Sequence, residues 1–556
     1  MINTFTVEKK TELNNLFQQI ANDLDITETQ FNNLVRSYNA VGKYLEDDDT
    51  FKAYRPVVTP QGSLRLGTII QPRTEDGDID VDLVYRLNGK SPIWTQKDIK
   101  LLVGKRLKEH GTYSGMLDKE EGRRCWTLLY RQDSDNAKEH YHMDILPSVS
   151  DSEFNRSYES IRSREYSQQT IDQIAIRITD NQDPGYGRST DITEWLKSNP
   201  DGYAMWFAHR CKSTSEKREN LFEAVMPMGK YVKEKTILQR IVQILKRHRD
   251  IMFKDDEDKP ISIIITTLAA RAYNGESSLL EGLYNVVSSM ESYIKRNSNG
   301  DFVISNPVNP EENFADKWPT HPKRKENFFK WLRQVKADLS NIITATGLQL
   351  RENVGSSFGE DFSKKMFNRM ADQHKQSAIN AGIKVGATGV LGSVGKTLNA
   401  KNTFSVRIKR LTSIQQVLVL KSRYEFRNSR WDIRPHGFTW FFDVTPTPLS
   451  DTYRLRIEYN EPFIPQVYVV SPKPLALSKG AERLPHTYDT KRQRLCLFRP
   501  HYGEWNSSML IADTIVHWAI EWLYYYENWV YTGKWLGGGH GNWDANFVDN
   551  TKKHID

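Results

Sequence analysis

The stretch QGSLRLGTIIQPRTEDGDIDVDLVYRL, residues 61–87, decides the fold because it places Asp78, Asp80 and Asp82 at every second position. Side chains alternate between the two faces of a β-strand, so these carboxylates share one face and the apolar residues between them face a core. Like charges repel unless a cation lies among them, and hard divalent ions such as Mg²⁺ prefer oxygen ligands. The stretch therefore predicts a metal-binding strand at 78–87, although an exposed edge strand or a Ca²⁺ loop would show the same spacing.

Two nearby segments extend this interpretation. In EHYHMDILPSV, Asp144 lies in a short apolar strand predicted at 140–147, where a charge needs a partner, either a metal ion or a structural ion pair. In GSLRLGT, the backbone N–H groups after Gly62 and the hydroxyl of Ser63 could hold phosphate oxygens, unless this is an ordinary turn. A phosphate-binding turn, paired aspartates and a distant aspartate together indicate nucleotidyl transfer assisted by two metal ions.

Composition limits the class of protein. The chain has 556 residues, too many for one core, with 38% hydrophobic and 26% charged residues, as expected of a globular chain of two or three domains. No apolar run approaches the roughly 20 residues of a membrane span, and the first residues show no secretory signal. The net charge of +7 permits a nucleotide ligand but gives no strong indication of nucleic acid. Three separated cysteines, Cys125, Cys211 and Cys496, predict neither a disulfide framework nor structural zinc, so a reducing cytoplasm is expected.

Periodicity outlines the elements. Residues 8–45 are predicted to be helical, with a capping box formed by Thr27 and Gln30. A further helix is predicted at 95–111, between the two strands, and the chain is mainly helical from about 190 to 380. Residues 380–402 are rich in Gly, Ala and small polar residues and are predicted to be a linker. Beyond them the chain is β-rich and aromatic and ends in a predicted helix or helix pair.

The combination GSLRLGT…DIDVDLVYRL…HMDILP resembles the nucleotidyltransferase core of the polymerase-β superfamily. It is most similar to the bacterial cGAS/DncV-like nucleotidyltransferases (CD-NTases) of anti-phage signalling systems. The resemblance covers about residues 5–380, including LKRHRDIMF, PISIIITTLAARAY and NPVNPEENFADKW. It implies synthesis of a cyclic di- or trinucleotide from NTPs, with ATP and GTP as the expected substrates.

The resemblance also implies roles for single residues. Asp80, Asp82 and Asp144 would form the metal triad for two Mg²⁺ ions, with Mn²⁺ as an alternative. Further residues of the implied site are Gln61, Gly62 and Ser63, which would hold the donor triphosphate; Lys246 and Ser262, which would contact the donor nucleotide unless they are a surface lysine and a helix cap; and Asp78, where relatives often carry an acidic residue.

A second candidate site lies in LPHTYDTKRQRLCLFRPHYGEW, residues 484–505. Cys496 stands between two leucines and is either a buried structural cysteine or a nucleophile. His486 and His501 could lower the pKa of its thiol if they are close in space. The layout, with NEPFIPQVYVVSPKP upstream and WAIEWLYYYENWVYTGKWLGGGHG downstream, resembles ubiquitin-conjugating (E2) folds. It is most similar to the E2-like proteins of type II CBASS operons.

One departure bears on the chemistry of this second site. Ubiquitin E2 proteins place Pro and Asn directly after the His, and that Asn supports the oxyanion. Here Thr487 and Tyr488 follow His486, which argues against lysine-directed transfer but not against thioester formation at Cys496.

The expected fold class is α+β, with a polymerase-β-like nucleotidyltransferase core, a helical lobe and a separate α+β E2-like domain. The predicted parts are the core at 1–185, the helical lobe at 186–380, the linker at 381–402 and the E2-like domain at 403–556.

The expected function is cyclic oligonucleotide synthesis, regulated by the E2-like domain or coupled to conjugation through it. The expected partners are a protein that binds the E2-like domain and an effector that receives the cyclic nucleotide; no membrane is expected. One alternative is an E2-like conjugating or scaffold protein gated by nucleotide binding. Another is a polynucleotide-tailing enzyme, which a net charge of +7 supports little.

Overall fold

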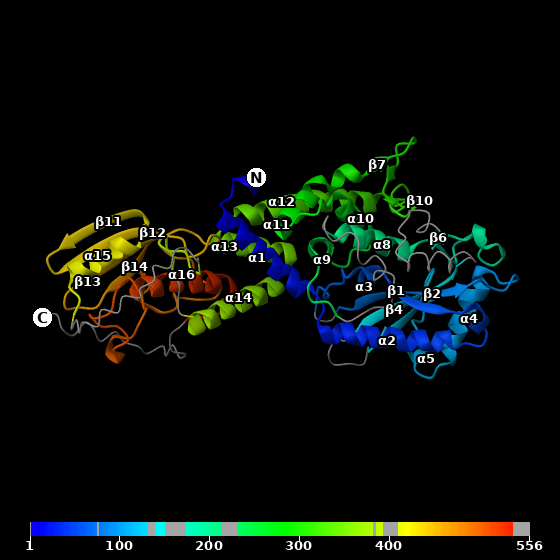
Figure 1. Ribbon diagram of the computed structural model, residues 1–556, viewed down its shortest axis with the longest axis horizontal. Coiled ribbons are helices and arrows are strands. Elements are labelled where there is room, and N and C mark those ends of the chain that lie inside the picture. Colours follow the sequence, from blue (N-terminus) through cyan, green and yellow to red (C-terminus); the bar gives the residue numbers. More distant parts are fainter. Residues whose placement is uncertain are drawn as a thin grey trace. The chain divides into compact units, whose positions relative to one another are not determined.

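The computed structural model describes residues 2–74, 77–131, 140–150, 174–212, 231–381, 385–392 and 410–537. The chain divides into two compact units. The N-terminal unit comprises Ile2 and Asn14–Leu339, and the C-terminal unit comprises Asn3–Leu13 and Ser340–Asp556. Both units combine helices with a β-sheet (Figure 1), as the α+β prediction requires.

The N-terminal unit is built on a six-stranded sheet with the order β1-β2-β4-β5-β6, in which β3 also pairs with β4. The strands are β1 (Val57–Gln61), β2 (Ile79–Asn88), β3 (Trp126–Tyr130), β4 (Tyr141–Ser150), β5 (Ile176–Ile178) and β6 (Lys197–Ser198). The helices around it are α2 (Glu28–Glu46), α3 (Gly62–Leu66), α4 (Gln96–Glu109) and α5 (Tyr113–Met116), and the part of α1 (Val7–Leu24) from Asn14 onward also belongs to this unit.

Strand β2 owes its position to its alternating pattern. Ile79, Val81 and Leu83 are buried against helices α2 and α4, while Asp80 and Asp82 are turned to the other face. β2 runs parallel to β4, and α4 lies in the connection between them. The predictions of strands at 78–87 and 140–147 and of a helix at 95–111 are confirmed. The buried face of each strand fixes its register in the sheet.

A group of helices and short strands completes the N-terminal unit. They are α8 (Pro200–Cys211), α9 (Ile237–Phe253), α10 (Ser262–Ala272), α11 (Leu279–Ser289), α12 (Pro322–Thr344), β7 (Lys295–Arg296), β8 (Phe302–Val303), β9 (Ser305–Asn306) and β10 (Asn309–Asn313). Helix α9 begins at a capping box formed by Thr236 and Gln239. Figure 1 shows α8, α9 and α10 on the side of the sheet opposite α2.

The C-terminal unit has its own six-stranded antiparallel sheet, with the order β11-β12-β13-β14-β16-β15. Its strands are β11 (Arg427–Arg434), β12 (Gly437–Val444), β13 (Tyr453–Asn460), β14 (Gln466–Ser471), β15 (Thr487–Asp489) and β16 (Arg494–Leu495). Its helices are α13 (Gly347–Phe358), α14 (Glu360–Ala381), α15 (Ser413–Arg423) and α16 (Ile515–Thr532). Buried aromatic residues of β12 and β13 pack with α16 in one core.

Helices α13 and α14 form a hairpin that belongs to the C-terminal unit. A buried ion pair joins it to α16, because Arg351 Nη1 lies 3.4 Å from Oε2 of Glu527. Glu527 is 1% exposed and accepts hydrogen bonds from Ser450 Oγ at 2.8 Å, Asp451 N at 2.8 Å and Tyr453 OH at 3.1 Å. These donors satisfy a carboxylate that burial would otherwise make costly.

Three more contacts lie along the same hairpin. Thr346 Oγ1 donates to Asp451 Oδ1 at 2.7 Å, Asn528 Nδ2 donates to Asn368 Oδ1 at 2.9 Å, and Tyr531 OH donates to Glu360 Oε2 at 3.1 Å. The hairpin is therefore part of the fold of this unit.

The four-part division at 185, 380 and 402 stays a prediction. Much of the predicted linker, at 382–384 and 393–402, lies outside the described residues. Among the helices that the structure describes, none is long and apolar enough to cross a membrane.

Candidate active site

Three aspartates of the N-terminal unit lie on adjacent strands. Asp80 and Asp82 are on β2 and Asp144 is on β4, and the parallel register places Asp82 directly opposite Asp144. Asp80 is opposite His142, and its side chain is 85% exposed. Residues two positions apart on a strand have side chains on the same face of the sheet, and paired residues on adjacent strands share that face. The predicted triad therefore lies on one face of the sheet.

Gly62 lies against this acidic face. It begins α3 directly after β1, and Gln61 is opposite Asp82 in the antiparallel pairing of β1 with β2. Gly62 has a φ of +61°, and a Cβ atom at this position would overlap Oδ2 of Asp82. Only glycine allows the backbone to approach the carboxylate so closely. This contact, in addition to the positive φ of the turn, explains why a glycine is needed at position 62. Ser63 follows in the first turn of α3 and is partly exposed.

The electrostatics of the triad reflect its crowding. Burial raises the pKa of Asp82 to about 6, and the charges of Asp144 and Asp80 add to the effect. Lys246 acts in the opposite direction. Asp144 accepts a 2.5 Å hydrogen bond from Thr127 Oγ1 on β3, which fixes its carboxylate. A buried carboxylate whose pKa neighbouring carboxylates raise further belongs to a donor set suited to a divalent cation.

Among the described residues, no group of three or more His, Cys, Asp or Glu side chains is placed to hold a metal ion together. Mg²⁺ is usually bound by one or two protein carboxylates and completes its shell with water and substrate phosphates. Asp82 and Asp144, which face each other in register, fit that kind of binding.

Asp78 has a different environment from the triad. Its Oδ2 lies 2.6 Å from His142 Nε2, and its Oδ1 lies 3.8 Å from His140 Nδ1. His142 also lies 3.9 Å from Asp80 through Nδ1. The sequence analysis missed His142, although its position two residues before Asp144 on a strand indicates the same face.

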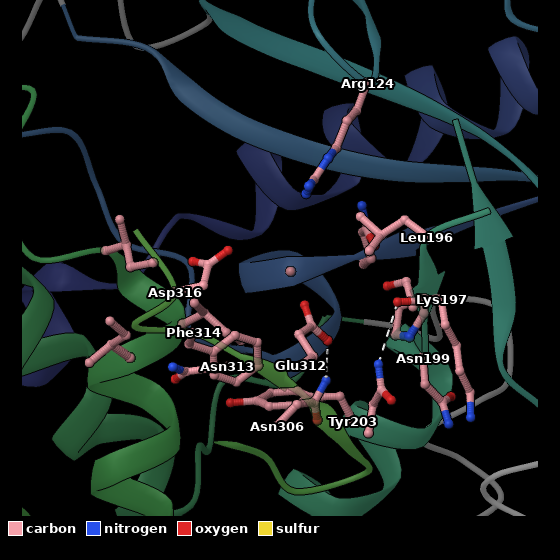
Figure 2. A pocket seen from close by; sticks show the side chains of 18 of the residues that line it. Arg124, Leu196, Lys197, Asn199, Tyr203, Asn306, Glu312, Asn313, Phe314 and Asp316 are labelled. Atoms are coloured by element: carbon pink, nitrogen blue, oxygen red, sulfur yellow. Dashed lines mark hydrogen bonds between the residues drawn. The ribbon is translucent and has the colours of Figure 1, made fainter. Parts of the chain in front are cut away.

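Asp82, Gln61 and Gly62 line a cavity of about 900 Å³. Much of its opposite wall comes from the segment NPVNPEENFADKW, which carries Asn306, Asn309, Glu312 and Phe314 (Figure 2). Figure 2 shows Arg124 pointing into this space from the sheet, across from Glu312. This segment is part of the CD-NTase resemblance in the sequence, but none of its residues was predicted to belong to the site.

Two residues carried over from the resemblance lie behind the cavity. Lys246 is buried, and its Nζ donates to the carbonyl oxygen of Thr68 at 3.0 Å, in the loop after α3. Burial lowers the pKa of Lys246 to about 8. Ser262 begins α10, and its Oγ accepts a 2.8 Å hydrogen bond from Arg249 Nη1. Neither side chain lines the cavity, and their assignment to the donor nucleotide stays a prediction.

The second candidate site is around Cys496 in the C-terminal unit. The thiol is half-buried, directly after β16, and burial raises its pKa. The hydroxyl of Tyr488 hydrogen-bonds with the thiol and lowers the pKa by less than burial raises it. Tyr488 OH also donates to the carbonyl of Phe498 at 2.7 Å, and Arg494 lies 4.8 Å from the centre of its ring.

The effect of His486 and His501 on the thiol pKa stays a prediction. The ring of His486 stacks on Trp535, with centroids 5.1 Å apart, and its carbonyl accepts the backbone N–H of Cys496 at 2.9 Å. Among the described neighbours of Cys496, the Tyr488 hydroxyl and the charge of Arg494 lower the thiol pKa. The side chain of His501 lies outside what the structure describes. The role of Cys496 stays a prediction.

Comparisons with known proteins match both units. Residues 12–170 match the family described as "Second Messenger Oligonucleotide or Dinucleotide Synthetase domain", and residues 416–542 match the family described as "Type II CBASS E2 protein". The c-di-GMP synthase of Roseivirga ehrenbergii is 30% identical over 394 residues, which cover 69% of this chain and 94% of the relative.

Two solved structures are also similar. The CD-NTase CdnG of Bradyrhizobium diazoefficiens in complex with GTP has 18% identity and a TM-score of 0.48, covering 65% of this chain and 99% of that one. CdnC of E. coli MS115-1 with ATP has 13% identity and a TM-score of 0.42, covering 62% of this chain and 97% of that one.

Proposed function

Because the chain belongs to the CD-NTase family, the cyclic-nucleotide synthases, and carries a CBASS E2 domain, we propose that it makes a cyclic dinucleotide from GTP. The name of its relative from Roseivirga ehrenbergii, a c-di-GMP synthase, supports GTP as the substrate. A cyclic trinucleotide and the use of ATP are the alternatives within this proposal. The product would serve as a second messenger for an effector in anti-phage defence. The need for NTPs favours the cytoplasm.

We assign the chemistry to Asp80, Asp82 and Asp144, and the in-register pair of Asp82 and Asp144 is the observation that carries this assignment. These carboxylates would hold two Mg²⁺ ions, which supply charge neutralisation at the triphosphate and activation of the acceptor hydroxyl. Thr127 holds the carboxylate of Asp144 in place through its 2.5 Å hydrogen bond.

Gly62 would bring the backbone N–H groups of its turn to the triphosphate beside Asp82. The close approach of its backbone to the Asp82 carboxylate supports this role, since a larger residue would separate the turn from the acidic face. Arg124 reaches into the same cavity, and Asp180 Oδ2 accepts a 2.9 Å hydrogen bond from its Nε. An oriented guanidinium there would neutralise phosphate charge and bind it at fixed geometry.

The test of this function is direct. Purified full-length protein is incubated with Mg²⁺ and each radiolabelled NTP, and the products are treated with phosphatase and with nuclease P1. A phosphatase-resistant product from GTP supports the proposal. Formation of only linear, phosphatase-sensitive products by active protein would contradict cyclisation.

We propose that the E2-like domain acts on a protein partner through Cys496. Thr487 and Tyr488 occupy the positions after His486 where conjugating enzymes carry Pro and Asn, so the chemistry that we propose is thioester formation or regulation rather than transfer to lysine. A thiol-sensitive adduct of the full-length protein in cells, absent from the Cys496→Ala variant, would support this role. An adduct that persists in that variant would contradict it.

A further inference from the structure

The wall of the cavity opposite Asp82 carries a carboxylate whose geometry is set by one amide. Asn306 accepts the backbone N–H of Val308 through Oδ1 at 3.0 Å, and this bond orients its side chain. The amide therefore presents its NH₂ group to Glu312, and Nδ2 donates to Oε2 of Glu312 at 2.8 Å (Figure 2). One carboxylate oxygen is thus occupied by the protein, and the other is left as an acceptor.

Glu312 shares the cavity with several cations, which include Arg124 and Lys197. None of the described cations forms an ion pair with its carboxylate. Its neighbour Tyr203 exchanges a 2.8 Å hydrogen bond with Thr267; burial raises the pKa of Tyr203, and the charge of Glu312 adds to this effect. The oxygen of Glu312 that Asn306 does not occupy can therefore accept a hydrogen bond from a ligand that brings N–H donors.

A second acceptor lies in the same wall. Asn309 is 3% exposed and lines the cavity, and its Nδ2 donates to the carbonyl of Lys197 at 3.4 Å. Its Oδ1 has no hydrogen-bond partner among the described residues. The segment that carries Asn309 and Glu312 therefore offers two oxygen acceptors to a ligand, one on each side chain.

We propose that Glu312, oriented by Asn306, selects guanine over adenine. This inference rests on the proposed function and names the residue that chooses the base. Guanine presents two adjacent N–H donors, at N1 and at the exocyclic N2, and the remaining oxygen of Glu312 can accept from N1–H. Adenine presents an acceptor at N1, which a carboxylate repels. The cavity that holds Glu312 also contains Gly62 and Asp82, so one nucleotide can reach both walls.

The test uses the full-length protein with Glu312→Gln. Asn306 still donates to this position, so the new amide turns its oxygen toward Asn306 and its NH₂ group into the cavity. That surface offers a donor to N1 of adenine and opposes N1–H of guanine. We expect the ratio of kcat/KM for GTP to that for ATP to fall about 10- to 150-fold, the loss of one charge-assisted hydrogen bond.

Equilibrium binding of non-hydrolysable GTP and ATP analogues is measured in parallel, because it reports base choice without turnover. Glu326→Gln is the matched control, since it removes the same charge from an exposed position of α12 that does not line the cavity. It should keep the GTP-to-ATP ratio of the parent. Thermal unfolding of each variant shows whether the fold is retained, and the ratio is compared only between folded variants.

The outcomes distinguish the role of Glu312 in base choice from the proposed synthesis of a cyclic dinucleotide. A parent protein that binds neither analogue and makes no product refutes the proposed function. A parent that uses GTP, together with a folded Glu312→Gln protein of unchanged preference, refutes the role of Glu312 alone. An equal loss of preference in Glu326→Gln would show a general effect of charge and also overturn the inference.

Discussion

The backbone of Gly62 lies so close to the carboxylate of Asp82 that a Cβ atom on Gly62 would overlap Oδ2. This contact ties the turn after β1 to the acidic face of β2. Gly62 also has a φ of +61°, a conformation that costs other residues free energy.

Gly62→Ala should therefore reduce cyclic nucleotide formation by at least about 100-fold, since a displacement of about 1 Å at a reacting centre has effects of that size. The measurement is the initial rate of product formation from GTP. Gly89→Ala is the matched control, because Gly89 has a φ of +88° but open space around its Cβ position. If both variants lose activity equally, backbone strain rather than the contact with Asp82 is responsible.

The double substitution Asp80→Asn and Asp82→Asn should lower pyrophosphate release by about 10³-fold or more, because electrostatic stabilisation of the triphosphate supplies much of the rate enhancement in such reactions. Removal of divalent cations with EDTA should have the same effect. Asp78→Asn should be milder, since Asp78 contacts His142 and His140. Near-parent rates in the double variant would show that the reaction occurs elsewhere.

Iodoacetamide should alkylate Cys496 slowly at pH 7 and faster as the pH rises, because burial raises the thiol pKa and the thiolate is the reacting form. Tyr488→Phe should slow the reaction further, since the thiolate fraction below the pKa falls tenfold for each unit of increase. Mass spectrometry of the modified peptide measures each rate. Cys125 and Cys211, whose pKa values burial raises to about 12, serve as slow internal references. Rapid alkylation at pH 7 would contradict this account.

Arg351→Ala should destabilise the C-terminal unit by about 3–5 kcal/mol, because it leaves the buried carboxylate of Glu527 without its cation. Urea unfolding, followed by tryptophan fluorescence, measures the change. The paired substitution Arg351→Met and Glu527→Gln should recover part of the stability, since it removes both charges while the amide oxygen can still accept from the buried donors around it. A single variant as stable as the parent would show that the ion pair contributes little.

Glu521→Gln should raise the thermal stability at pH 8.5. Burial raises the pKa of Glu521 to about 7, against the opposing charge of Lys375 on α14. The folded state therefore binds a proton between about pH 4.5 and 7 that the unfolded state has lost, so stability falls as the pH rises through this window. The gain in Tm should be about 2–6 °C at pH 8.5 and should vanish below about pH 4.5. An equal gain at both pH values would indicate packing rather than ionisation.

Local patterns in the sequence predicted much of the N-terminal unit. The capping box of Thr27 and Gln30 starts α2 as expected, and the alternation in β2 assigned Asp80 and Asp82 to one face. These features depend on neighbours within a few positions of the chain. Asp144 was identified from its place in a short apolar strand, but its register opposite Asp82 is a property of the folded sheet.

Long-range packing could not be predicted in the same way. The bond between Asn306 and Glu312 spans six residues, but its place opposite the acidic strand depends on how distant segments fold. The helices α13 and α14 fall in the stretch that was predicted to be mainly helical. Nothing in their own sequence identifies α16 as their partner. The pKa of Cys496 also depends on burial, which its two flanking leucines did not specify.

The hairpin of α13 and α14 has a consequence for the integrity of the protein after cleavage. A protease that cuts between residues 392 and 410 would sever the covalent path but leave Arg351 and Glu527, Asn368 and Asn528, and Glu360 and Tyr531 in contact. The two fragments should then migrate together as a nicked complex. Separately produced halves should likewise reassemble by complementation. The helical hairpin and α16 are thus held together by direct contacts. Their association therefore does not depend on the length of the segment that connects them.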